Sequence, residues 1–272
     1  MDKFSARHPI LFQLLVFIAA FILVLVVSLG ASVTCSAEAE AQNMHVAIGR
    51  LIAGGVLFLV FIRYFNIKKQ LSGIVVMLPA LLFAVWNIVL HFSMGGARAE
   101  NYAYALILGL APAVFEEVVF RGVFIHNLRA NGRSPMSALL ISAIFFGVVH
   151  MTNLLGSQHI INVIIQVSYS IVVGLVFGAI YIRTGDLVSV IIAHAIIDIS
   201  SKILPSGQVI AFQWCIALIA LLVVETFYAV HLMHSMATDS TSGISSSAGT
   251  GEVHFGYYRA IANRFHQKST TR

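Results

Sequence analysis

Long apolar runs, separated by short polar segments, fill most of the chain up to residue 234. A helix needs about 20 predominantly apolar residues to cross the hydrocarbon core of a bilayer, and most of the runs have about that length. The pattern predicts about eight transmembrane helices, over residues 10–30, 46–65, 71–92, 102–125, 136–151, 160–182, 187–204 and 208–234. We therefore expect an all-α fold, a polytopic membrane helical bundle.

The composition agrees with an integral membrane protein. Of the 272 residues, 59% are hydrophobic and only 10% are charged, against roughly a quarter charged in soluble proteins. The net charge is +5, but the bases are spread over short loops rather than gathered in a patch, so no nucleic-acid partner is expected. Most Lys and Arg residues lie at the predicted helix ends that share one side, which predicts a cell-membrane protein with both termini in the cytoplasm.

The chain divides into a bundle and a tail. Residues 1–234 form the predicted transmembrane bundle, with its chemistry concentrated in residues 100–204. From Ser235 the composition changes to Ser, Thr, Gly and Ala, which is typical of a flexible linker. The basic end, 253–272, fits either an amphipathic helix on the anionic inner leaflet or a disordered tail. Cys35 and Cys215 match neither a metal-binding spacing nor a disulfide framework.

Three charged residues interrupt the apolar run 102–125: Glu116, Glu117 and Arg121. A charge at the centre of a bilayer costs a few kcal/mol, so three within two turns indicate a function. Residues four apart lie on one helix face, and Glu117 is therefore expected to pair with Arg121 and to orient the site. Glu116 lies on a different face, shared with Pro112 and Phe120, and is left free to act.

Other ionisable residues stand in later apolar runs. His150 ends one run, and His194 and Asp198 are four apart on a shared helix face. At about 1.5 Å of rise per residue, Glu116, His150 and His194 lie about 18, 21 and 12 Å from the cytoplasmic ends of their helices. The four side chains are thus expected to meet in a chamber in the cytoplasmic half of the membrane or near its midplane.

Two kinds of chemistry fit this set of side chains. A glutamate and a histidine around one water can deprotonate it for attack on a peptide carbonyl, and a second histidine can stabilise the oxyanion. The same groups, with Glu116, His150 and His194 as candidate ligands, could instead bind a divalent metal such as zinc. The chain has no His-Glu-x-x-His motif that would decide between them.

The motifs Glu116-Glu117-x-x-x-Arg121, Phe146-x-x-x-His150 and His194-x-x-x-Asp198 resemble, in that order, the signature of the CAAX prenyl protease and bacteriocin-processing (CPBP, or Abi) family. The resemblance covers about residues 100–204, and in this segment the chain is similar to the type II CAAX prenyl endopeptidases. It implies an intramembrane endopeptidase. Members of the family are described both as metalloproteases and as glutamate-type proteases.

By the same resemblance, Glu116 and His150 would activate the water, and His194 with Asp198 would stabilise the oxyanion. Glu117 and Arg121 would orient the site. The prenyl endopeptidases usually have Asn where this chain has Asp198, so Asp198 would act protonated, orient His194 or contribute to a metal site. The expected reaction is cleavage of a membrane-associated peptide near the cytoplasmic face; a prenylated CAAX protein, a bacteriocin leader and a membrane-bound regulator all fit.

A non-proteolytic role is the alternative. Buried carboxylates and imidazoles also form proton relays in transporters, or a scaffold in a bacteriocin self-immunity protein. Of the remaining polar residues, Glu225 is expected to be structural, and Arg50 to extend to the external surface along the apolar stem of its side chain. The small-residue pairs Gly54 with Gly55, and Gly174 with Gly178, predict close helix packing.

Overall fold

The computed structural model describes residues 7–34, 39–61, 71–93, 102–156, 160–202 and 212–241. This part of the chain is helical and contains no strand, so the predicted all-α fold is confirmed. The α-helices are α2 (Pro9–Thr34), α3 (Ala39–Phe61), α4 (Leu82–Ser93), α5 (Tyr102–Glu117), α6 (His126–Ala130), α7 (Pro135–Val148), α8 (Ile160–Thr184), α9 (Leu187–Lys202) and α10 (Phe212–Thr241). A π-helical stretch, Val118–Ile125, joins α5 to α6, and 3₁₀ stretches occupy Pro79–Leu81 and Val149–Gly156.

Each predicted span contains a helix of the structure, with three larger differences in the bounds. α3 begins at Ala39, seven residues before the predicted start of the second span. The third span is helical only from residue 79, because turns occupy residues 71–78. α10 continues past His234 to Thr241, so the first residues of the predicted tail are helical. The rest of the tail, including its basic end, lies outside the described residues.

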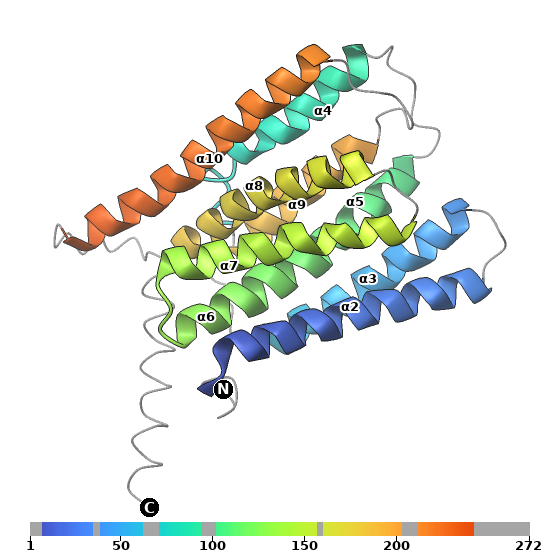
Figure 1. Ribbon diagram of the computed structural model, residues 1–272, viewed down its shortest axis with the longest axis horizontal. Helices are drawn as coiled ribbons and strands as arrows, with labels where there is room; N and C mark the ends of the chain where they lie inside the picture. The colour runs from blue at the N-terminus through green and yellow to red at the C-terminus, as the bar shows by residue number, and fades with distance from the viewer. Residues whose placement is uncertain are drawn as a thin grey trace, which may run out of the picture.

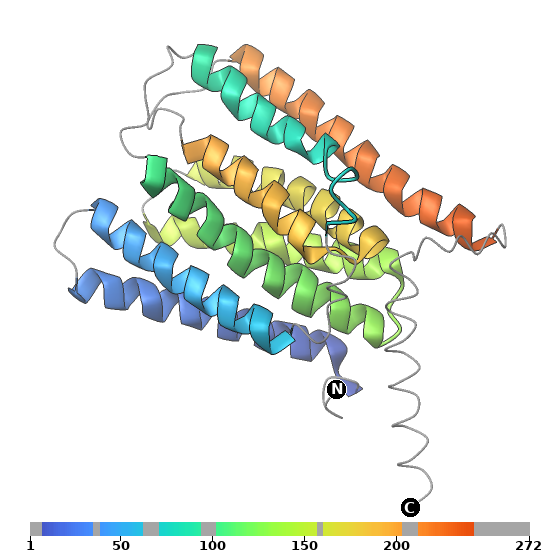
Figure 2. The ribbon, with the colours of Figure 1, turned by 180° about the vertical axis from the view of Figure 1, so that it is seen from behind.

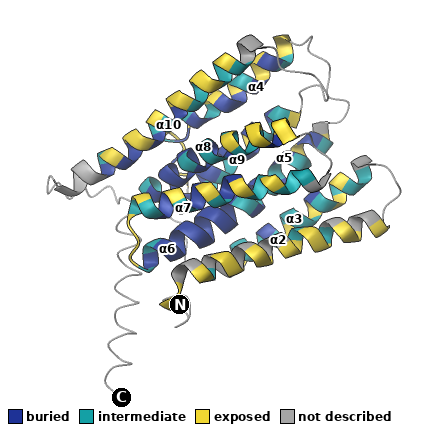
Figure 3. Cartoon of the chain, viewed as in Figure 1, coloured by how far each residue is buried: buried dark blue, intermediate teal, exposed yellow. Residues whose placement is uncertain are grey.

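Four helical stretches in the described part of the chain are long and apolar enough to cross a membrane: Ala103–Ala130, Pro135–Leu154, Ile160–Thr184 and Cys215–Met236. α5 and α6 continue in one direction through the π-helical stretch, and the other neighbouring helices in the chain run in opposite directions (Figures 1 and 2). The start of α2, the turns after α6 and α8, and the end of α10 therefore lie at one end of the bundle, on the left of Figure 1. Buried residues concentrate on α5, α6, α8 and α9, while the outer faces are exposed and apolar (Figure 3).

Glycines let the helices around the centre approach closely. A Cβ added to Gly54 of α3 would lie 2.8 Å from the Cα of Phe115 in α5, and one added to Gly109 of α5 would lie 2.6 Å from the backbone nitrogen of Ile199 in α9. A Cβ added to Gly174 of α8 would lie 3.0 Å from the Cα of Ala143 in α7. The predicted close packing is confirmed at Gly54, Gly174 and Gly178, but it is wrong at Gly55, where an added Cβ would meet nothing within 4 Å. The contacts of Gly54 and Gly109 fix the register of α3 and α9 on α5.

The turn between α8 and α9 is held by a buried carboxylate. Gly185 has φ of +69°, which suits glycine, and Asp186 then caps α9 by accepting hydrogen bonds from the backbone N–H (3.0 Å) and hydroxyl (2.6 Å) of Ser189. Asp186 also accepts a hydrogen bond from the N–H of Gly73 at 2.8 Å. The acid therefore ties the turns of residues 71–78 to this end of the bundle.

Candidate active site

A cavity of about 690 Å³ lies among α3, α5, α8, α9 and the 3₁₀ stretch that follows α7. The four predicted catalytic residues, Glu116, His150, His194 and Asp198, all line it. They come from three segments that are far apart in the sequence, as expected from the motifs. The structure therefore brings the candidate residues together around one space.

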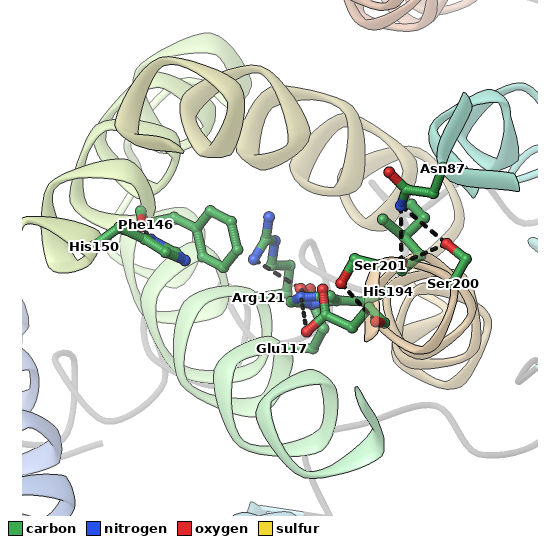
Figure 4. A network of polar contacts seen from close by, with 10 residues as sticks. Asn87, Glu117, Arg121, Phe146, His150, His194, Ser200 and Ser201 are labelled. Carbon is green, nitrogen blue, oxygen red and sulfur yellow. Dashed lines mark hydrogen bonds and ion pairs between the residues drawn. The ribbon is translucent and has the colours of Figure 1, made fainter. Parts of the chain in front are cut away.

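The centre of the site is the carboxylate of Glu117, which is fully buried. Its Oε1 accepts hydrogen bonds from Nη1 of Arg121 at 3.0 Å and pairs with Nδ1 of His194 at 2.7 Å (Figure 4). The Arg121 pair follows from the helix spacing and was predicted. The His194 contact joins α5 to α9 and was missed, because no local pattern gives the register of two helices.

Arg121 is also fully buried, and several groups compensate its charge. Its Nη2 donates to the carbonyl of Gly174 at 3.3 Å. Its guanidinium lies 4.5 Å from the ring centre of Phe146 and 5.6 Å from that of Phe177, within the range of cation–π attraction. Arg121 therefore holds the Glu117 carboxylate in place and connects α5, α7 and α8 around it.

His194 is held at one ring nitrogen and faces the cavity with the other. Its Nδ1 contacts Glu117, and its Nε2 lies 3.7 Å from Oδ2 of Asp198, beyond hydrogen-bond distance. A carboxylate on one ring nitrogen orients an imidazole and fixes which nitrogen carries the proton. In this arrangement Glu117 presents Nε2 of His194 to the cavity beside Asp198.

His150 begins the 3₁₀ stretch after α7 and is half-buried. Its Nδ1 lies 2.9 Å from the carbonyl oxygen of Phe146, one turn earlier. When Nδ1 carries the proton and donates to this carbonyl, Nε2 is an acceptor. The ring of Phe146 packs edge-on against both His150 and His194, at centre distances of 5.5 and 5.9 Å, and separates the two imidazoles.

The structure places Glu116 as the sequence predicts, on a different helix face from Glu117 and without an ion-pair partner among the described residues. Like Pro112 and Phe120 it lines the cavity, and it is half-buried. Within the described residues it makes no hydrogen bond and no ion pair, whereas its neighbour Glu117 makes both. Its carboxylate oxygens are thus available to a water or substrate in the cavity.

The described residues contain no group of three His, Cys, Asp or Glu side chains spaced to hold a metal ion. The candidate ligands Glu116, His150 and His194 share the cavity but do not converge at metal–ligand distances. The donors present fit hydrogen bonding to water and peptide better than coordination of zinc.

The cavity lies toward one end of the bundle. Its lining includes Asn43 near the start of α3, Asn153 after α7 and Lys202 at the end of α9. These points are at the end opposite the α6–α7 and α8–α9 turns, which the sequence places in the cytoplasm (Figure 1). The cavity therefore extends toward the side that the predicted topology makes external, and cleavage near the cytoplasmic face requires the opposite orientation of the chain.

Polar side chains that the motifs did not identify also line the cavity. Asn87 of α4 donates to the carbonyl of Ile197 at 3.3 Å and to the hydroxyl of Ser200 at 3.0 Å (Figure 4). Asn153 donates to Gln166 at 2.8 Å and fixes the 3₁₀ stretch to α8. A lone polar residue in an apolar run was the available signal, but it does not distinguish a cavity lining from helix packing.

The fold and the site define a polytopic helical membrane protein that encloses a cavity of carboxylates and imidazoles. Residues 98–200 match the family model described as "Type II CAAX prenyl endopeptidase Rce1-like". The predicted resemblance is confirmed, and the match supports a membrane-embedded CAAX-type protease, a hydrolase. Searches of curated proteins and of solved structures give no match.

Proposed function

We propose that this protein is an intramembrane endopeptidase that hydrolyses a peptide bond in the cavity by general-base attack of water. The observation that carries the proposal is the contrast between two adjacent acids. Glu117 is buried and paired, whereas Glu116 is unpaired within the described residues and lines the cavity with His150. CAAX-type peptides are the substrates that the family match supports.

In the proposed reaction, Glu116 and Nε2 of His150 hold a water between them and take its proton. The hydroxide adds to the carbonyl carbon of the scissile bond, and the carbonyl oxygen becomes an oxyanion. When the carbon–nitrogen bond breaks, the proton taken from the water passes to the leaving amine. The reaction consumes one water and yields a carboxylic acid and an amine, which become a carboxylate and an ammonium when the acid's proton passes to the amine.

His194 supplies the oxyanion donor in this proposal. With both ring nitrogens protonated, Nδ1–H bonds to Glu117 and Nε2–H is free to bond to the developing oxyanion. Asp198 lies 3.7 Å from Nε2 and orients that N–H rather than donating to the oxyanion itself. This assignment gives a role to an aspartate at a position where the prenyl endopeptidases usually have Asn.

The test is the Glu116→Gln variant, with Glu225→Gln as its matched control. Both replace a carboxylate by an amide in an apolar helix, but Glu225 lies on α10 and does not line the cavity. The assay is release of the C-terminal tripeptide from a synthetic peptide ending in prenylcysteine and three further residues, followed by mass spectrometry with protein in liposomes. Loss of a general base predicts a kcat/KM lower by about 10²- to 10⁴-fold for Glu116→Gln, and near wild-type activity for Glu225→Gln. Full activity of Glu116→Gln, or no cleavage by the wild type, would contradict the proposal.

A further inference from the structure

Two basic side chains line the same cavity as the candidate catalytic residues. Arg50 belongs to α3 and Lys202 is the last residue of α9. The sequence predicted that Arg50 extends to the membrane surface. Instead it lines the cavity, and its Nε is buried without a hydrogen-bond partner among the described residues.

The packing of α3 against α5 gives the position of Arg50 along the bundle axis relative to Glu116. Gly54 packs against Phe115, and α3 and α5 run in the same direction (Figures 1 and 2). Arg50, one turn before Gly54, is therefore level with Ala111 of α5. At 1.5 Å per residue this level is about 7 Å from that of Glu116, toward the end of the bundle to which the cavity extends.

The register of α9 gives the height of Lys202 in the same way. Gly109 of α5 packs against Ile199, and α9 runs opposite to α5. Lys202 lies three residues past Ile199, which puts its backbone about 15 Å from the level of Glu116. Its exposed side chain extends from this level into the cavity lining.

Neither cation is neutralised by a described acid at close range. The basic group of Lys202 interacts electrostatically with Asp198, one turn away, but the two form no ion pair within 4 Å in the described part of the chain. Arg121, by contrast, has a carboxylate, a carbonyl and two rings around it. Unpaired cations in a cavity lined mainly by apolar helices indicate a site for an anion.

We infer that Arg50 and Lys202 bind the C-terminal carboxylate of the peptide substrate, and of the short product that leaves after cleavage. This inference rests on the proposed function. Three residues in extended conformation span about 10 Å, so the terminal carboxylate of a peptide cut three residues from its end lies between the levels of Arg50 and Lys202. The bidentate geometry of a guanidinium suits a carboxylate, and Arg50 is the stronger contact. The two cations thus set the number of residues between the cleaved bond and the free C-terminus of the substrate.

The experiment compares two peptides with three proteins. The peptides share one prenylated sequence and end in a free carboxylate or in a carboxamide; the proteins are wild type, Arg50→Gln and the control Arg133→Gln. Arg133 is exposed in the α6–α7 turn at the opposite end of the bundle. A charge-assisted hydrogen bond accounts for about a 10- to 100-fold difference. Wild type and Arg133→Gln should therefore cleave the carboxylate peptide about 10- to 100-fold faster in kcat/KM than the amide, and Arg50→Gln should cleave both at the slower rate. Lys202→Gln should show a smaller loss of the same kind.

Equal cleavage of both peptides by wild type, or an equal loss on both peptides in Arg50→Gln, would overturn the inference while leaving the peptidase intact. A lipid headgroup bound to these cations would give that result. A binding measurement separates the inference from the failure of cleavage: equilibrium dialysis of an aliphatic tripeptide and its amide against the Glu116→Gln variant. The carboxylate site is supported if the tripeptide acid binds more tightly than its amide and if this preference is lost in the double variant that also carries Arg50→Gln. Equal binding of the two peptides, or no binding, contradicts the site.

Discussion

Asp186, in the turn between α8 and α9, and Glu116, on α5, are acids of the same bundle, and their surroundings differ in kind. Asp186 is fully buried at one end of the bundle, and three donors, two from Ser189 and one from Gly73, occupy its oxygens. Glu116 is half-buried in the wall of a cavity, and within the described residues no donor reaches it. The first acid holds segments of the chain together, and the second has acceptor capacity left for a ligand.

For these two acids, the partners of the carboxylate and its contact with the cavity together separate a structural role from a chemical one. Glu117 combines the two cases, because its fully buried carboxylate contacts both Arg121 and His194, and one of those partners faces the cavity. A buried acid is structural when its partners are all fixed parts of the fold. It serves the site when one of its partners is a side chain that touches the cavity.

Removing the carboxylate of Glu117 should have the largest effect. Glu117→Ala leaves the buried guanidinium of Arg121 without its counter-charge and Nδ1 of His194 without an acceptor, and breaking a buried pair in this way costs about 3–5 kcal/mol. We expect a large fall in Tm in detergent and loss of peptide cleavage. Glu117→Gln keeps an acceptor oxygen and should fall between Glu117→Ala and wild type. A Glu117→Ala variant with wild-type Tm would show that Arg121 does not depend on this pair.

A change at Asp186 should affect stability but not chemistry. Asp186→Asn puts an amide NH₂ where the carboxylate accepted hydrogen bonds, and an unsatisfied buried donor or acceptor costs about 1–3 kcal/mol. Tm should fall, while kcat/KM of the folded fraction stays near that of wild type. Ser189→Ala removes only the hydroxyl donor and should give a smaller fall. A large loss of kcat/KM in folded Asp186→Asn would break the distinction between the two ends of the bundle.

Asp198→Asn should have the smallest effect. Asn keeps the size and an oxygen near Nε2 of His194, and its NH₂ can also donate to an oxyanion. We expect kcat/KM within about tenfold of wild type, since one hydrogen bond contributes about 0.5–1.5 kcal/mol. Asp198→Leu removes the polar group at similar size and should lose more. Equal activity of the two variants would remove Asp198 from the proposed mechanism.

Features that depend on residues close together in the chain could be predicted from the sequence. The helices follow from apolar runs, and the Glu117–Arg121 pair follows from a spacing of four residues. The free face of Glu116 follows from the same geometry, since a residue next to Glu117 points about 100° away.

Features that depend on tertiary register could not be predicted. The Glu117–His194 contact requires α9 to lie at one height on α5, which Gly109 and Ile199 determine by their close approach. The contact that joins the turns of residues 71–78 to the α8–α9 turn runs from the N–H of Gly73 to Asp186, more than a hundred residues later in the chain. The π-helical stretch Val118–Ile125, directly after the two glutamates, also has no signature in the apolar pattern.

The central claim, that Glu116 faces a water-filled cavity within the bundle, can be tested without any substrate. In a protein carrying Cys35→Ser and Cys215→Ser, Glu116→Cys and Glu225→Cys each introduce a single thiol, and reaction with a charged, water-soluble methanethiosulfonate is followed by mass spectrometry. Glu225 is fully buried on α10 and does not line the cavity. We predict that the thiol at position 116 reacts in the folded protein while the thiol at position 225 reacts only after denaturation. A thiol at position 116 as unreactive as the one at 225 would contradict the account.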